Sequence, residues 1–150
     1  MKLTLDTHLL VRLTTQDDPG QAALALQLLK KATLIAVPTP VLCEWVWVLL
    51  RGYRHTQAQA AHAVRTLLQV RQVVCHTPAV LAGLALLQAG GDFADGVIAF
   101  EGGLLGGAEF VSFDRQAVEL PKGQKRKARL LGAPPPRVGA KAWVANDGAA

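Results

Sequence analysis

Four carboxylates lie either directly after a predicted strand or within or at the start of a predicted apolar helix. They are Asp6 after Lys2–Leu5, Glu44 within VLCEWVWVLL, Asp95 before GVIAF, and Asp114 after AEFVSF. Like charges a few ångströms apart force protonation, so these acids can converge only where a cation offsets their repulsion. Mg²⁺ and Mn²⁺ prefer carboxylate and water oxygens, and no His/Cys set competes for a softer metal. The pattern therefore predicts a hard divalent cation held by carboxylates.

Each of these acids also has a purely structural interpretation. Asp6 can cap the helix that follows it, and Asp114 can begin a turn in SFDRQ. Asp92, three residues before Asp95, is interpreted as the N-cap of its helix. Glu44 is harder to explain in this way, because an unpaired carboxylate on an apolar helix is costly to bury. We therefore expect a functional role for Glu44.

Short apolar segments alternate with helical ones along the chain. The predicted strands cover residues 2–5, 34–37, 73–76 and 108–113, and the predicted helices cover 7–13, 19–31, 38–53, 56–71, 77–89 and 93–105. This alternation predicts an α/β fold with a parallel sheet covered on both faces. In such a sheet, binding sites lie beyond the carboxyl ends of the strands, where Asp6 and Asp114 are expected.

Length and composition favour one domain. A chain of 150 residues that is 51% hydrophobic is long enough for a single compact core. No apolar run reaches the roughly 18 residues that cross a bilayer, and Asp6 argues against a signal peptide. Cys43 and Cys75 are predicted to be reduced and buried. We expect a cytoplasmic protein that does not enter a membrane.

Positive charge is concentrated near the C-terminus. Residues 1–114 carry a net charge of −1 and residues 115–150 carry +6, which together give the +5 of the whole chain. The segment PKGQKRKARLLG is either a solvated helix face or a contact for a phosphate-rich partner. After it, GAPPPRV can supply an edge strand, and residues 139–150 are expected to form a flexible tail.

Four segments in order carry a resemblance to a known family: LDTHLLVRL, the Glu of VLCEWVWVLL, DFADGVIA and SFDR. Over about residues 1–138 the chain resembles the PIN domain of VapC-type toxins. This resemblance implies a three-layer α/β/α fold with a central parallel sheet of four or five strands. It also implies a Mg²⁺- or Mn²⁺-dependent endoribonuclease that is paired with an antitoxin. Homodimerisation is expected from the resemblance and from the apolar helix around Glu44.

The resemblance assigns roles to individual residues. Its four acids are Asp6, Glu44, Asp95 and Asp114, of which Asp6, Asp95 and Asp114 would hold the metal while Glu44 orients or deprotonates the attacking water. The outer shell would comprise Thr7, His8, Asp92 and Ser112, where His8 replaces the Asn of many relatives. From their positive charge, and not from the resemblance, Arg12, Arg115, Lys125, Arg126, Lys127 and Arg129 are expected to contact the RNA backbone. By analogy with the family, cleavage leaves a 5′-phosphate and a 3′-hydroxyl.

Two other functions compete with this hypothesis. One is a catalytically weak PIN-like module that only binds RNA or a protein partner. The other is a metal-dependent phosphatase for small phosphate esters, which would be expected to carry a D-x-D motif after the first strand. LDTHLL lacks the second acid of that motif, so the phosphatase is disfavoured.

Overall fold

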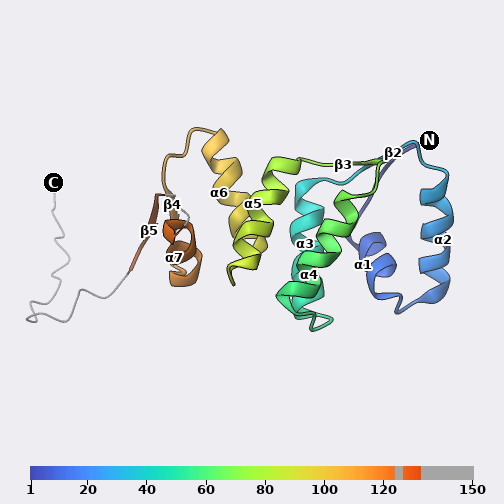
Figure 1. The fold of residues 1–150 in the computed structure, drawn as a ribbon, viewed down its shortest axis with the longest axis horizontal. Coiled ribbons are helices and arrows are strands. Elements are labelled where there is room, and N and C mark those ends of the chain that lie inside the picture. The colour runs from blue at the N-terminus through green and yellow to red at the C-terminus, as the bar shows by residue number, and fades with distance from the viewer. Residues whose placement is uncertain (124–126, 133–150) are drawn as a thin grey trace, which may run out of the picture.

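The computed structural model describes residues 1–123 and 127–132. In chain order its elements are β1 (Lys2–Thr4), α1 (Thr7–Thr15), α2 (Pro19–Lys30), β2 (Leu34–Ala36), α3 (Thr39–Arg51), α4 (Gln57–Leu68), β3 (Val73–Val74), α5 (Thr77–Gln88), α6 (Phe93–Leu104), β4 (Phe110–Ser112), α7 (Arg115–Gly123) and β5 (Ala128–Leu130). The helices stand in a row from α2 to α7, and β2 and β3 run along one edge of that row (Figure 1).

Local sequence signals set where most helices begin. Asp18 accepts a hydrogen bond from the Gln21 amide, and Pro19 occupies the first turn of α2. Thr56 and Gln59 form a reciprocal capping box that starts α4. These polar caps satisfy amide groups that have no partner inside their helix. They explain why the starts of these helices could be predicted from the sequence.

The described strands form two separate parallel sheets. In the first sheet the order is β1-β2-β3, with Leu3 opposite Ile35 and Ile35 opposite Val73. In the second, β4 pairs with β5, and Phe110 lies opposite Ala128. Parallel neighbours need a long crossover, which α1 and α2 provide between β1 and β2.

The expected central sheet of four or five strands is therefore corrected. Figure 1 shows α5 and α6 between the three-stranded sheet and the β4–β5 pair. Because α6 packs against α5, the chain enters β4 on the far side of these helices, where β5 becomes its partner. Strand pattern alone does not specify which strands pair. The fifth strand among the described residues is Ala128–Leu130, whereas the edge strand expected of GAPPPRV and the tail expected at 139–150 lie outside the described part of the chain.

Two glycines allow α5 and α6 to approach closely. A Cβ placed on Gly96 would lie 2.6 Å from the Ala82 carbonyl oxygen and 2.9 Å from the Cα of Gly83. A Cβ placed on Gly83 would lie 2.7 Å from the ring of Phe93, which is buried in the core. Only residues without a Cβ fit at this crossing. The crossing fixes the first turn of α6, which carries Asp95.

The main hydrophobic core lies between the first sheet and helices α1, α3, α4, α5 and α6. Its largest α3 side chain is Trp45, which is 2% exposed and donates its indole N–H to Thr14 Oγ1 at 3.2 Å. A buried indole N–H needs such an acceptor. None of the helices among the described residues combines the length and apolar character needed to cross a membrane.

Candidate active site

Asp6 and Glu44 belong to one part of the candidate site. Asp6 caps α1 by accepting a hydrogen bond from the Leu9 amide at 2.9 Å. The next residue, Thr7, is buried at 7% exposure, and its Oγ1 donates to Glu44 Oε2 at 2.7 Å. This bond joins the first residue of α1 to α3. The structural role considered for Asp6 is thus present, and Thr7 contacts the candidate acid Glu44, while its outer-shell role stays a prediction.

Glu44 is not the buried, unpaired carboxylate that its apolar surroundings suggested. It is exposed on α3, while its neighbours Trp45 and Val46 face the core. Its hydrogen bond to Thr7 fixes one carboxylate oxygen. The sequence argument from burial is therefore wrong for Glu44, because a one-residue step on a helix turns the side chain by about 100°. Glu44 is left held at one oxygen and open to solvent.

Asp92, Asp95 and Asp114 form the second part of the site. Asp92 is the N-cap of α6, as predicted, and accepts a hydrogen bond from the Asp95 amide at 3.2 Å. Burial, followed by the negative charges of Asp92 and Asp114, raises the pKa of Asp95 above its ordinary value. The three acids thus share one electrostatic neighbourhood, although Asp114 comes from the strand pair beyond α6 (Figure 1).

Asp114 is held by the turn that leads from β4 into α7. Its amide donates to Ser112 Oγ at 3.0 Å, and its Oδ1 accepts from the Gln116 amide at 2.9 Å. The side chain of Gln116 donates to the Gly90 carbonyl at 2.9 Å, which ties this turn to the loop before Asp92. Ser112 thus contacts the backbone of Asp114, and its outer-shell role stays a prediction.

The two groups of acids do not meet as a metal centre in this arrangement. Among residues 1–123 and 127–132, His, Cys, Asp and Glu side chains form no group of three or more that could hold a metal ion. A Mg²⁺ site built by protein ligands draws on several oxygens around one point. The described positions of Asp6, Asp95 and Asp114 do not meet that requirement.

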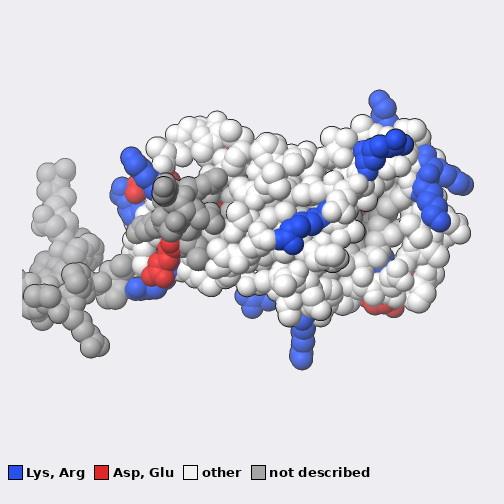
Figure 2. All heavy atoms as spheres, in the orientation of Figure 1, with Lys and Arg blue, Asp and Glu red and all other residues white. Residues whose placement is uncertain are grey.

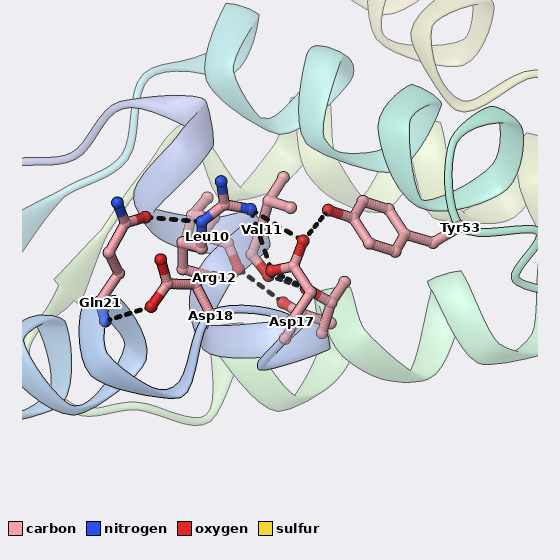
Figure 3. A network of polar contacts seen from close by, with 9 residues as sticks. Leu10, Val11, Arg12, Asp17, Asp18, Gln21 and Tyr53 are labelled. Atoms are coloured by element: carbon pink, nitrogen blue, oxygen red, sulfur yellow. Dashed lines mark hydrogen bonds and ion pairs between the residues drawn. The ribbon is translucent and has the colours of Figure 1, made fainter.

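Arg12 is already engaged by protein groups, as Figure 3 shows. Its Nη1 donates to both oxygens of Asp17 at 2.9 and 3.0 Å, and its Nε donates to Gln21 Oε1 at 2.7 Å. The hydroxyl of Tyr53 also donates to Asp17, and this bond is the largest cause of the lowered pKa of that carboxyl. An RNA phosphate would have to compete with these partners for Arg12.

The other basic residues expected to contact RNA are spread over the β4–β5 end. Arg115 lies 3.7 Å from Glu119 one turn along α7, and Arg129 on β5 pairs with Glu109. Lys127 is exposed, whereas residues 125 and 126 lie outside the described part of the chain. Figure 2 shows further Lys and Arg side chains gathered at the opposite end, around α2 and the N-terminus. Positive charge on this face is therefore not confined to the C-terminal region.

His8 lies on α1 and faces α2. It lines a cavity of about 320 Å³ between α1 and α2, together with Leu9, Arg12 and Gln21. Its ring forms no hydrogen bond among the described residues. Its expected outer-shell role remains a prediction.

The order of the acids and the α/β elements around them can now be compared with known proteins. A scan against protein-family models matches residues 3–123 to the PIN domain. The chain belongs to the PIN domain family. PIN domains are generally nucleases and typically use divalent metal ions, so the match supports a general nuclease role for this chain. A search of curated proteins found no match.

The PIN domain match covers all four candidate acids and ends at the last residue of α7, before β5. It therefore leaves residues 124–138 of the expected nuclease domain outside the matched range. Sequence reasoning also missed three residues that shape the site. They are Gly96 at the helix crossing, Gln116 at the Asp114 turn and the exposed Trp47 on α3. A glycine directly after Asp95 was the one visible signal, since Gly inside a helical pattern often marks close packing.

Proposed function

We propose that this PIN domain is an endoribonuclease that depends on Mg²⁺ or Mn²⁺ and hydrolyses RNA phosphodiester bonds. The observation that carries the proposal is the presence of four acids in the family's order within the matched range, with Asp95 in the electrostatic field of two further carboxylates. Surplus negative charge of this kind destabilises a folded protein. A site that binds a cation offers a functional reason to retain it.

Glu44 is the described residue best suited to act on the attacking water. Thr7 fixes its Oε2, and the rest of the carboxylate is open to solvent. A general base has to be oriented and reachable by the proton that it removes. Water would attack the phosphorus as it gives a proton to Glu44, and the bond to O3′ would break as O3′ takes up a proton, leaving a 5′-phosphate and a 3′-hydroxyl.

A cleavage assay on denaturing gels tests this function. Single-stranded RNA is incubated with the full chain in Mg²⁺, in Mn²⁺ and in EDTA. Activity should require a divalent ion and should fall severely in the variants Asp6→Asn, Glu44→Gln, Asp95→Asn and Asp114→Asn. Asp18→Asn is the matched control, because Asp18 caps α2 outside the site and Asn caps equally well. Normal turnover by Asp95→Asn would refute the site assignment.

A second function is favoured by a specific observation. The described acids do not converge on a metal, as would be expected of a catalytically weak PIN-like module that binds RNA or a protein. The same assay separates the two functions. RNA binding without divalent-dependent cleavage would identify the weak module, whereas cleavage that EDTA abolishes would identify the nuclease.

We further propose that the protein is the toxin of a toxin–antitoxin pair and forms a homodimer. Large exposed apolar side chains on α2, Leu24, Leu26 and Leu28, offer surface for a protein partner. Light scattering at micromolar concentration, alone and with the product of the neighbouring gene, tests both partners. A monomer whose mass does not change on mixing would refute this assignment.

A further inference from the structure

A small polar cavity lies directly beside Asp92. It has a volume of about 200 Å³ and is bounded by α3, α4, the turn between α5 and α6, and α7. Its lining consists of Trp47, Leu50, Arg51, Gln57, Gly90, Gly91, Asp92 and Gln116. None of the roles assigned above uses this cavity, although one wall of it is the N-cap that holds Asp95.

Two glutamine side chains brace the wall of the cavity. Gln116 Nε2 donates to the Gly90 carbonyl at 2.9 Å, and Gln57 Nε2 donates to the Gly91 carbonyl at 3.3 Å. These bonds connect α7 and α4 to the same turn. Each amide keeps its oxygen available as an acceptor, and the Asp92 carboxylate adds another. The cavity therefore presents acceptors suited to the N–H groups on the edge of a nucleobase.

Trp47 supplies a flat apolar surface at the mouth of this cavity. It is 58% exposed, in contrast to the buried Trp45 on the same helix, and among the described residues its ring stacks on no other aromatic ring. Glu44, Trp47 and Arg51 are all exposed and recur at i, i+3 and i+7. They therefore share one face of α3 and span about 10 Å along its axis. The face leads from Glu44 to the cavity.

Arg51 adds an available positive charge at the end of this face. Among the described residues it forms no ion pair, whereas Arg12 and Arg129 each pair with a carboxylate. A guanidinium suits phosphate oxygens in both charge and hydrogen-bond geometry. The free cation and the exposed indole thus lie one helical turn apart.

We propose that this α3 face and its cavity bind one nucleotide of single-stranded RNA. The base stacks on Trp47, its edge faces Gln57, Gln116 and Asp92, and a flanking phosphate contacts Arg51. This subsite rests on the proposed ribonuclease function and places its bound nucleotide beside the one cleaved at Glu44. Single-stranded RNA fits better than a duplex, because only an unstacked base can lie flat on a side chain.

The polar lining favours RNA over a protein partner. Interfaces between proteins usually centre on desolvated apolar pockets. Here the indole borders two amides, a carboxylate and a guanidinium instead. An exposed Trp also suits a protein interface, so the test includes that outcome.

Fluorescence anisotropy of a short labelled single-stranded RNA in EDTA measures binding without metal-dependent cleavage. Trp47→Ala should weaken binding about 5- to 150-fold, the factor expected for losing one base–aromatic stack, and Trp47→Phe should recover much of it. Leu81→Ala is the matched control, since Leu81 is a similarly exposed apolar side chain on α5. Arg51→Gln should reduce the slope of log K against log salt by about 0.7, whereas Arg71→Gln should not change it.

The possible results separate this proposal from the function on which it rests. Unchanged affinity and salt slope in Trp47→Ala and Arg51→Gln, with normal cleavage, would overturn the subsite and leave the nuclease function intact. Loss of binding in these variants, in a wild-type protein that never cleaves, would support the subsite and refute the nuclease function. A change of mass in light scattering with unchanged RNA affinity would identify a protein interface and overturn the proposal. Circular dichroism of each variant checks that it is folded.

Discussion

Replacing Gly96 by Ala should destabilise the protein, although the same change elsewhere in α6 should stabilise it. Gly96 lies at the crossing with α5, where a new Cβ would stand 2.6 Å from the Ala82 carbonyl oxygen and 3.0 Å from Leu86 Cβ. Contacts below 3.0 Å with backbone cannot be relieved by rotating a side chain, so the two helices have to separate. Gly102 lies in the same helix, and a Cβ there would have no atom within 4 Å.

The paired variants isolate the cost of this clash. Gly→Ala in a helix gains up to about 1 kcal/mol of intrinsic stability, and this gain applies at both positions. Overpacking costs about 1–3 kcal/mol and applies only at Gly96. Gly102→Ala should therefore exceed Gly96→Ala in the free energy of unfolding by about 1–3 kcal/mol. For a chain of this length that corresponds to roughly 2–12 °C in melting temperature.

Urea denaturation followed by circular dichroism measures both free energies, and thermal melts give the matching temperatures. RNA cleavage by Gly96→Ala should also fall, because Asp95 immediately precedes the displaced residue. Equal stability of the two variants would refute the close crossing of α5 and α6. Gly96→Ala melting above the wild-type protein would contradict it still more directly.

Three further predictions concern side chains around the acids. Thr7→Val should cost about 1 kcal/mol in urea denaturation because it removes the donor to Glu44; a double-mutant cycle with Glu44→Leu, which removes the acceptor, would contradict this bond if it found no coupling. In EDTA, Asp95→Asn should be more stable than the wild-type protein at pH 7. A raised pKa means that the folded state binds more protons than the unfolded chain, so wild-type stability falls as pH rises through the raised pKa of Asp95. The difference in stability between Asp95→Asn and the wild-type protein should therefore vanish below pH of about 4. Parallel stability profiles of the two proteins against pH would refute this prediction. Burial, with the charges of Asp92 and Glu101, raises the pKa of Cys43 to about 11, so iodoacetamide labelling mapped by mass spectrometry should be slow at pH 8, and rapid labelling at pH 7 would show the thiol to be open.

The sequence by itself determined where the local elements lie. Caps such as Asp18, Thr56 and Asp92 act within three residues of themselves, so they mark helix starts without reference to the rest of the chain. The order of the acids was likewise visible in the sequence, and all four lie within the PIN domain match over residues 3–123. Interactions between residues close in sequence, and the order of residues, can both be read without knowledge of the tertiary structure.

The environment of each acid depended on tertiary structure. An apolar run suggested that Glu44 is buried, yet the packing of α3 buries Trp45 and leaves Glu44 exposed. The sequence could not give the partner of Glu44, because Thr7 is 37 residues away. The burial of a side chain depends on which face of its helix packs against the neighbouring elements. A helix that is apolar on most faces can bury a similar apolar area in several rotations about its axis.

The pairing of the strands and the separation of the acids into two groups depended on contacts between segments far apart in the sequence. The segment predicted as a strand at residues 108–113 belongs to a different sheet from the three earlier ones. The helices α5 and α6, which pack closely at Gly83 and Gly96, stand between the two sheets (Figure 1). The same packing places Asp95 near the negative charges of Asp92 and Asp114, whereas Asp6 caps α1. A strand carries no local record of its partner, since its hydrogen-bonding groups are the same at every residue. Only the packing of the helices selects which edges meet.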